Sequence, residues 1–299
     1  MTMLYKCTFL IASIYLIISL LSRMDNITLK DTTSHQLPPF VSNYFEKWND
    51  CAKIQFLNSN VDAKEFWKSF QTKSRKCDSD ADIQNSMNVL TFKNRDEKKF
   101  GILPIQNSSE SIFITLGIGQ DIIAEELFLE KMNEQSSNVT FYGADPIPEG
   151  NSELYSEIGQ YLPFAVGGKT GFSTASVLKN GKYQKLVVVH IDINYFISEI
   201  LQEKTIDYLW MDSEYAEYGT FDIFYKNGRM SQEAITFCQM SIEIHNPNME
   251  QKEQFMALIK RLLEEKQFGF FFSHNVGHIR LWLFNFGSHY CVNKFLKTN

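Results

Sequence analysis

The stretch Ile112-Phe-Ile-Thr-Leu-Gly-Ile-Gly119, followed by Val139-Thr-Phe-Tyr-Gly-Ala-Asp-Pro146, decides the fold of this chain. Residues 112–116 form a short apolar, β-branched run, which is typical of a buried parallel strand. Gly117 and Gly119 follow at once, and glycine lets a backbone turn tightly and approach a ligand closely. The stretch therefore predicts a buried strand that ends in a turn facing a ligand.

The residues after this turn complete a βαβ unit. Residues 121–132 carry apolar side chains at helical spacing, and a second strand over residues 139–143 leads to Asp145. This acid follows the glycines by about 25 residues, where a mononucleotide-binding unit needs an acceptor for ribose hydroxyls. An ordinary βα turn followed by a helix-capping acid is the alternative interpretation.

Length and composition limit the class of protein. The chain has 299 residues, 25 of them phenylalanine, and a net charge of -6. This length suits one domain of roughly 200 residues with appendages, and the aromatic residues supply a large core. Because the charge is negative and no basic stripe is present, we expect no nucleic-acid partner.

The first residues are not expected to belong to the fold. Residues 7–22 are uncharged and almost wholly apolar, and the apolar residues before them can extend the run to a membrane span. Leu20 and Ser22 fit a signal-peptide cleavage site poorly. We therefore interpret residues 1–24 as an uncleaved signal anchor in the membrane; a cleaved signal and a secreted protein are the alternative. The flanking charges barely discriminate the orientation.

Other signals favour the secretory pathway, with the folded domain in the lumen of the ER or Golgi. Asn26, Asn107 and Asn138 each begin an Asn-x-Ser/Thr motif, so we expect a glycoprotein. The motif at Asn138 is the weakest, because it lies very near a predicted strand.

The five cysteines give a second signal. Cys7 lies in the apolar segment, whereas Cys51 and Cys77 flank one helical region and are predicted to pair. Cys238 and Cys291 are expected on strands, where we favour buried free thiols over a disulfide because free cysteine is a common core residue. No cysteine or histidine spacing is typical of zinc.

The chain is predicted to have four parts. Residues 1–24 are the anchor, residues 25–39 a linker, residues 40–100 a small helical subdomain and residues 101–299 the main domain. Further predicted elements are a solvated charged loop at residues 94–99, strands at 162–166, 206–211, 234–244, 268–273 and 279–286, a hairpin at 172–191, and helices at 215–225 and 249–266.

Strands alternating with helices and a final strand hairpin predict an α/β fold: a doubly wound, mostly parallel sheet with an antiparallel edge strand. Ligands of such sheets bind beyond the carboxyl ends of the strands. The residues expected to meet at that edge are Gly117, Gly119, Asp145, Asp212, Glu214, Glu243 and His245.

The order of elements and the run Ile206-Asp-Tyr-Leu-Trp-Met-Asp-Ser-Glu-Tyr-Ala-Glu217 resemble the FkbM family of S-adenosylmethionine-dependent methyltransferases. In that family a strand ends in Asp-x-Glu-Gly-x-Glu at this place. The resemblance is closest to the nematode branch and covers about residues 101–296. The five motifs that carry it lie in order at residues 115–119, 143–146, 163–167, 238–245 and 280–285.

The resemblance implies the class I methyltransferase fold, with S-adenosylmethionine as the cofactor. Gly117 and Gly119 would face the methionine and ribose parts, and Gln120 would adjoin them. Asp145 would bind the ribose hydroxyls, and Asp212 would lie at the catalytic end of the fourth strand.

Three places depart from the family pattern. Thr115 replaces the acid before the first glycine, Gln120 and Asp121 stand where a third glycine is usual, and Tyr215 replaces the glycine after Glu214. These departures leave a catalytically inactive binding module with a methyltransferase fold as the alternative function.

Methyl transfer to an oxygen needs alignment of the reactants and a base near the attacked hydroxyl. Asp212, Glu243 and His245 are the predicted catalytic residues, and Glu214 is a further candidate base. Glu243 and His245 are two residues apart, so they project from the same face of a strand. Three of these residues also have an alternative role. Asp212 could cap the following helix, Glu214 could be a solvated surface charge, and His245 could be a structural histidine.

Asp212, Glu243 and His245 could together bind a divalent metal. Their positions have no recognisable ligand spacing, so no metal is expected.

The expected function is therefore that of an O-methyltransferase held to the membrane by its N-terminal segment. Its acceptor would be a hydroxyl of a small molecule or a glycan. A nucleotide-sugar transferase is disfavoured, because Asp78-Ser-Asp80 matches its metal motif by letters only and is expected in a polar loop before the sheet.

Overall fold

The computed structural model describes residues 36–57, 60–179 and 181–297. The expected anchor at residues 1–24, most of the expected linker and the motif at Asn26 lie outside these residues. Among the described helices, none combines the length and the apolar character that crossing a bilayer requires.

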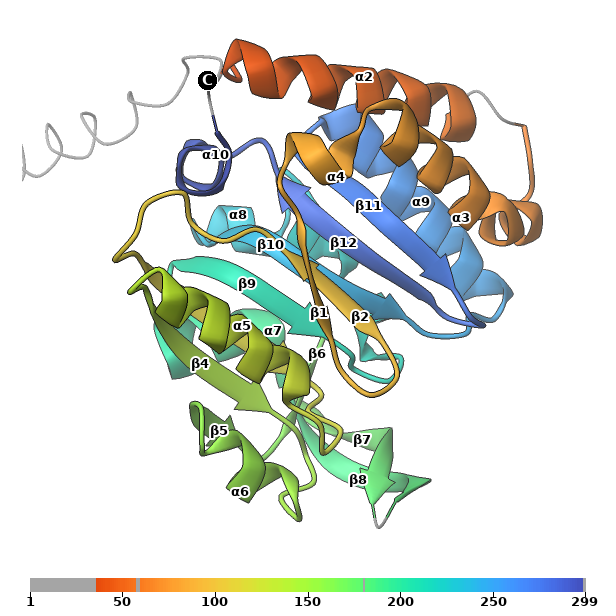
Figure 1. Cartoon of the computed structure of the whole chain (residues 1–299). Coiled ribbons are helices and arrows are strands. Elements are labelled where there is room, and N and C mark those ends of the chain that lie inside the picture. Colours follow the sequence, from red (N-terminus) through yellow and green to blue (C-terminus); the bar gives the residue numbers. More distant parts are fainter. Residues whose placement is uncertain (1–35, 58–59, 180, 298–299) are drawn as a thin grey trace, which may run out of the picture. The chain divides into compact units, whose positions relative to one another are not determined.

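The main sheet has seven strands in the order β11-β12-β10-β9-β3-β4-β5 (Figure 1). Their bounds are β3 (Glu110–Leu116), β4 (Asn138–Ala144), β5 (Gln160–Leu162), β9 (Thr205–Met211), β10 (Thr236–Ile244), β11 (Phe268–Asn275) and β12 (Ile279–Asn285). The strands from β10 to β5 are parallel, which confirms the predicted α/β class. The place of the antiparallel strand was predicted wrongly: β12 lies between β10 and the edge strand β11 and is antiparallel to both.

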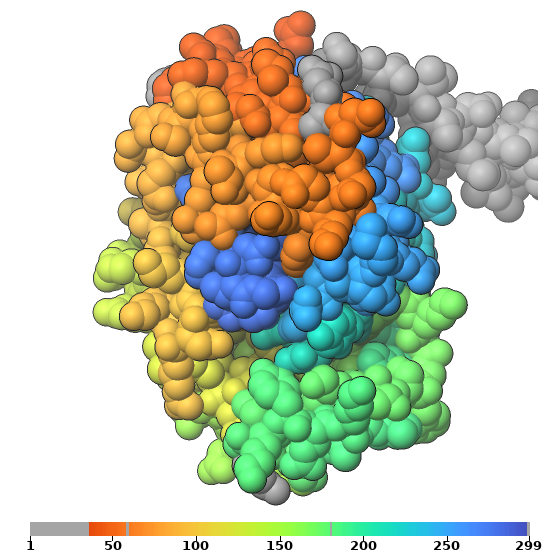
Figure 2. Space-filling view, turned by 90° about the vertical axis from the view of Figure 1, so that its right-hand side faces the viewer, coloured from red at the N-terminus to blue at the C-terminus, as the bar shows by residue number. Residues whose placement is uncertain are grey.

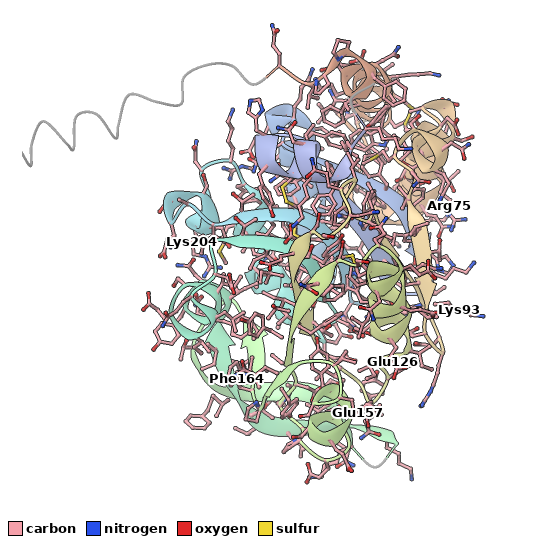
Figure 3. All side chains as sticks on the ribbon, turned by 60° about the vertical axis from the view of Figure 1, so that its left-hand side comes forward. Arg75, Lys93, Glu126, Glu157, Phe164 and Lys204 are labelled. Carbon is pink, nitrogen blue, oxygen red and sulfur yellow. A yellow bond between two sulfur atoms is a disulfide. The ribbon has the colours of Figure 1, made fainter. Side chains whose placement is uncertain are left out.

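Three further strands, β6 (Ala165–Gly167), β7 (Gly171–Lys179) and β8 (Lys182–Asp192), form a separate sheet in the order β6-β8-β7. The predicted hairpin is confirmed, but the single strand expected at residues 162–166 is divided between the two sheets. Pro163 stands at the division, where a residue without an N–H cannot continue a ladder. The next residue, Phe164, is labelled in Figure 3. Its ring packs edge-on against that of Phe196.

Helices α2 (Pro39–Phe56), α3 (Ala63–Asp80) and α9 (Met249–Glu265) pack together beside β11 (Figure 1). Aromatic rings hold this layer: the Phe70 ring centroid lies 4.9 Å from that of Phe255 and 5.7 Å from that of Phe270. α9 is the predicted amphipathic helix, and it begins with a capping box between Asn248 and Gln251.

Two further elements pack on the main sheet through aromatic side chains. One is the hairpin of β1 (Leu90–Lys93) and β2 (Lys98–Gly101), and the other is helix α5 (Ile123–Glu134). Phe128 of α5 lies 5.3 Å from Phe92 and 4.9 Å from Phe113, ring centroid to ring centroid. The prediction of a solvated loop at residues 94–99 was therefore wrong at its end, since Lys99 belongs to β2 and is 8% exposed.

Two disulfides join distant elements. The predicted Cys51–Cys77 bond is confirmed and links α2 to α3. Cys238 and Cys291 are also bonded, with their Cα atoms 5.1 Å apart, so the expectation of free thiols was wrong. Cys291 lies on helix α10 (His289–Phe295) rather than on a strand, and this helix returns the end of the chain to β10. Two disulfides are typical of a protein from an oxidising compartment.

Candidate active site

A pocket opens at the carboxyl ends of β3, β4 and β9, on the side of the molecule that faces the viewer in Figure 2. The β7–β8 hairpin, green at the bottom of that view, forms one of its walls. Gly117, Gly119, Asp145, Asp212 and Glu214 all line it. The structure thus brings together residues from three strand ends that lie almost 100 positions apart in the sequence.

The glycine turn shapes the floor of this pocket. Gly117 and Gly119 have φ angles of +84° and +62°, in the left-handed region that side chains disfavour. A Cβ atom at Gly117 would lie 1.9 Å from the carbonyl oxygen of Asp212, so glycine allows β3 and β9 to end side by side. A Cβ atom at Gly119 would have no described heavy atom within 4 Å, so this backbone faces open pocket space.

Asp145 holds the turn in place. Its Oδ2 accepts hydrogen bonds from the backbone N–H groups of Ile118, at 3.0 Å, and Gly119, at 3.4 Å, while Oδ1 accepts one from Ile147 at 2.8 Å. Burial raises the pKa of this carboxyl, and the same backbone N–H groups oppose the rise. A carboxylate has about four acceptor positions, and the three backbone N–H groups together with the Asn151 side chain contact this one. Asp145 is therefore firmly positioned at the edge of the pocket.

The side chain of Gln120 points to the segment after β4. Its backbone N–H donates to Asn151 Oδ1 at 2.7 Å, and its side-chain Nε2 donates to the carbonyl of Glu149 at 3.3 Å. It braces the turn against that segment.

The hairpin adds two pocket residues that the sequence did not single out for the site. Tyr183 and His190 both line the pocket from β8. His190 Nδ1 lies 2.8 Å from the hydroxyl of Ser173 on β7, and burial lowers the pKa of its imidazole. Asp192, two residues after His190, pairs with Arg229 at 2.6 Å.

A charged cluster lies beside the pocket, around His245. Its Nε2 is 3.2 Å from Asp212 Oδ1, 3.7 Å from Glu214 Oε2 and 3.6 Å from Glu243 Oε1. The structure therefore places two of the predicted catalytic residues, Asp212 and Glu243, within contact distance of the third, His245. Asp212 belongs to both places, since it lines the pocket and also a smaller cavity next to Glu243 and Arg280.

Glu217 fixes the orientation of this histidine. Its Oε1 accepts a hydrogen bond from the His245 backbone N–H at 2.7 Å and lies 3.1 Å from Nδ1. With Nδ1 carrying the proton toward this carboxylate, Nε2 faces Asp212 and Glu214. Glu217 is fully buried, although the sequence analysis did not single it out for the site. The segment expected to be a helix consists of two short 3-10 turns, Ala216–Gly219 and Phe221–Phe224, and the first turns Glu217 inward.

Cations on the far side balance part of the charge. Arg280 Nε donates to Glu243 Oε2 at 2.7 Å and lies 3.3 Å from Glu97 Oε2. Lys99 pairs with Glu97 at 3.1 Å, and His278 Nε2 lies 3.0 Å from Glu243 Oε1. The charged hairpin before the sheet thus contributes to the site, which the sequence pattern did not indicate.

These contacts displace the pKa values of the cluster. Burial opposes a charged His245, but the side-chain contacts with Asp212 and Glu217, together with the charges of these carboxylates, outweigh it and raise the pKa of the imidazole to about 11. Burial and the charge of Asp212 raise the pKa of Glu243 to about 7, although Arg280 opposes the rise. Groups with strongly displaced pKa values within one cleft are typical of functional sites.

Thr115 stands at the position where the resemblance to the FkbM family implies an acidic residue. Its hydroxyl is hydrogen-bonded to an acidic side chain, that of Glu125. Its Oγ1 donates to Glu125 Oε1 on α5 at 3.0 Å and accepts from the Tyr155 hydroxyl at 3.1 Å. Glu125 is 1% exposed, so a carboxylate is present at this strand end although it comes from a helix.

Two solved structures are similar to the chain at 12% identity. A structure described as human methyltransferase 10 domain containing protein covers 59% of this chain and 72% of its own, with a TM-score of 0.30. A methyltransferase from Pyrococcus furiosus covers 60% and 77%, with a TM-score of 0.29. These TM-scores are too low to define the fold, which rests on the strand order given above.

A search of curated proteins finds no significant match. A family model described as the methyltransferase FkbM domain matches residues 62–290, which include the glycine turn, Asp145, Asp212 and His245. Because this match spans more than half of the chain, the protein belongs to the FkbM methyltransferase domain family.

Proposed function

We propose that this protein is an S-adenosylmethionine-dependent O-methyltransferase. The observation that carries the proposal is that Gly117, Asp145 and Asp212 line one pocket at the carboxyl ends of adjacent parallel strands. The family match supports the reaction class, and the charged cluster beside the pocket supplies groups that can manage the proton of a hydroxyl acceptor.

The pocket residues fit this cofactor. The open space at Gly119 lets the backbone approach a bulky ligand, and Asp145 lines the same pocket with a carboxylate that can face ribose hydroxyls. Val166 and Val177 give the pocket an apolar side against which an adenine ring can pack. S-adenosylmethionine supplies a methyl group that is already activated, so the task of the chain is to align the acceptor and accept its proton.

Asp212 is the residue best placed for that task. It lies on the border between the pocket and the smaller cavity, within 3.2 Å of His245. We assign the acceptor hydroxyl to this border, with Asp212, Glu243 and His245 as the groups that orient it and hold its proton. The acceptor is a small molecule or a glycan, and the relationship to the nematode branch is part of this proposal.

The proposal includes a membrane anchor at residues 1–24 and a catalytic domain in the lumen of the secretory pathway. The two disulfides support this placement, because they form in oxidising compartments.

Calorimetric titration of the full-length chain with S-adenosylmethionine tests the function. We expect one cofactor per chain, and release of S-adenosylhomocysteine when hydroxyl acceptors are supplied. Asp145→Asn should weaken cofactor binding, since it removes the charge that holds the glycine turn and reaches the ribose. A folded chain that binds no cofactor would contradict the proposal and favour the inactive binding module.

A further inference from the structure

The cluster around His245 has the composition of a metal site. Asp212, Glu214 and His245 each offer one ligand atom, and the three atoms lie within 4.8 Å of one another. Two come from the end of β9 and the loop that follows it, and the third comes directly after β10. A set of two carboxylates and an imidazole on adjacent strand ends is a coordination set for a divalent cation.

One carboxylate oxygen in this cluster has no hydrogen bond to satisfy it. In the described part of the chain, Asp212 Oδ1 is buried without a hydrogen-bond partner, and the nearest imidazole nitrogen, His245 Nε2, lies 3.2 Å away. The His245 side chain is 9% exposed, and its Nε2 is turned toward Asp212, Glu214 and Glu243. A buried polar atom without a hydrogen bond is costly, and a bound cation would satisfy this oxygen.

The opposite side of the imidazole is arranged as in metal-bound histidines. His245 Nδ1 is 3.1 Å from Oε1 of the fully buried Glu217, which also accepts the His245 backbone N–H. A metal-bound histidine commonly donates its other ring N–H to such a carboxylate, which fixes the ring and leaves the ligating nitrogen free.

The excess of negative charge in the cluster also favours a bound cation. Asp212, Glu214, Glu217 and Glu243 are four carboxylates, and among the described residues Arg280 is the one arginine or lysine within ion-pair distance of them. Carboxylates this close repel one another unless cations lie between them. A dication bound by Asp212 and Glu214 would relieve that repulsion.

We propose that Asp212, Glu214 and His245 bind one divalent cation that prefers oxygen ligands and accepts one imidazole, for which Mn²⁺ is the suitable probe. Glu217 positions His245 from behind. The inference rests on the proposed function for its role: Asp212 and Glu214 line the cofactor pocket, so the cation would lie where the methyl group meets its acceptor.

This placement defines the class of acceptor. A cation with open positions binds two neighbouring oxygen atoms, so the acceptor is a vicinal diol, as sugars present. The hydroxyl nearer the pocket loses its proton to Glu243, its oxygen bonds to the methyl carbon, and the carbon–sulfur bond breaks to leave the neutral thioether. A bound cation favours this step because it stabilises negative charge on that oxygen.

The test is titration of the chelator-stripped, full-length chain with MnCl₂, followed by the electron paramagnetic resonance signal of free Mn²⁺ without cofactor. We expect one bound Mn²⁺ per chain. Glu214→Gln and Asp212→Asn should each weaken binding by about tenfold or more. Glu264→Gln, which removes an exposed acid on α9, is the matched control and should bind as the native chain does.

Thermal unfolding of each variant shows whether it is folded. Glu214 is the decisive position if Asp212→Asn fails to fold, because its side chain is 22% exposed and lies at the pocket rim. No binding by the native chain, or equal binding by folded Glu214→Gln, overturns the metal site.

Two further measurements separate this inference from the proposed function. Mn²⁺ binding at this site in a chain that binds no S-adenosylmethionine supports the metal site and overturns the function. Cofactor-dependent methylation that is undiminished in excess chelator overturns the role of the metal and leaves the function standing.

Discussion

Tyr215 adopts a backbone conformation that belongs to glycine. Its φ angle is +79°, and the resemblance described in the sequence analysis implies glycine at this position. Gln120, which stands where a third glycine is usual, has a φ angle of +60°. Each strained residue has compensating contacts: the Tyr215 ring lies 5.3 Å from the His245 ring, and the Gln120 backbone bonds to Asn151. Both positions therefore hold a left-handed backbone with a side chain present.

The two glycines of the pocket floor should respond differently to alanine. Gly117→Ala places a Cβ within 1.9 Å of the Asp212 carbonyl, so β3 and β9 must separate and the free energy of unfolding should fall by several kcal/mol. Gly119→Ala meets open space, so it should cost only about 1 to 2 kcal/mol for the left-handed conformation. Its methyl group enters the pocket, however, and should weaken binding of S-adenosylmethionine about tenfold, the equivalent of roughly 1.4 kcal/mol.

Denaturant unfolding and calorimetry measure these two effects. Gly181→Ala is the matched control, since Gly181 has a φ angle of +71° and no described heavy atom within 4 Å, but lies in the tip of the β7–β8 hairpin. If Gly119→Ala binds cofactor as tightly as Gly181→Ala does, the assignment of the pocket floor is wrong.

Among the secondary-structure elements, Asp78 links helices α2 and α3 to strand β11. It lies on α3, its Oδ1 accepts from Trp48 Nε1 of α2 at 3.1 Å, and its Oδ2 accepts from the Phe272 backbone N–H of β11 at 2.8 Å. Burial raises the pKa of this carboxyl to about 7, although both hydrogen bonds oppose the rise.

Asp78 should make the protein less stable as the pH rises from about 4 to about 7. In that range the native state holds a proton that the unfolded state has released, so its contribution is present at low pH and is lost as the pH passes the native value. The slope cannot exceed about 1.4 kcal/mol per pH unit for one group. Asp78→Asn should flatten the dependence, measured by urea unfolding at several pH values.

The control for this experiment is Asp80→Asn, at an exposed carboxylate that pairs with Lys76 on the same helix. It should keep the pH slope of the native chain. Equal slopes in the native chain and in Asp78→Asn would show that Asp78 does not carry a buried proton.

The sequence predicted those elements whose signals are local. The glycine turn, the amphipathic helix α9 and the Asn-Gly hairpin follow from periodicity and turn chemistry. The position of β12 and the Cys238–Cys291 bond depend on which segments pack beside β10, and local patterns do not carry that information. Pairing of cysteines separated by 53 residues is a property of the tertiary fold.

At the scale of the whole molecule, the site residues also divide into those with a local sequence signal and those whose place depends on tertiary packing. Asp145, Asp212 and His245 could be predicted because acids and histidines at the ends of parallel strands meet at one edge. Lys99 and Glu217 could not be predicted as site residues. Lys99 reaches the cluster from a hairpin that precedes the main sheet, and Glu217 reaches it from a 3-10 turn. Their burial as charged residues follows only from partners that the fold supplies.

The position of the glycosylation motifs tests the proposed topology of the whole protein. Asn107 and Asn138 are exposed and lie just before β3 and at the start of β4, the amino ends of parallel strands. The Asn138 N–H donates to the Ser109 carbonyl at 2.8 Å, so the two motifs lie side by side, and the pocket is at the opposite ends of these strands. Glycans there would leave the pocket open.

A lumenal domain should therefore carry a glycan at Asn107, whose loop remains accessible. We expect glycosidase treatment of the full-length chain from eukaryotic cells to increase its gel mobility. In an Asn26→Gln background, Asn107→Gln should remove most of that shift, and Asn138→Gln should change it little because the residue is paired within a strand. A native chain that is insensitive to glycosidase would contradict the lumenal placement, while the methyltransferase pocket and its cofactor test would stand unaffected, because glycan attachment and ligand binding occur at opposite edges of the sheet.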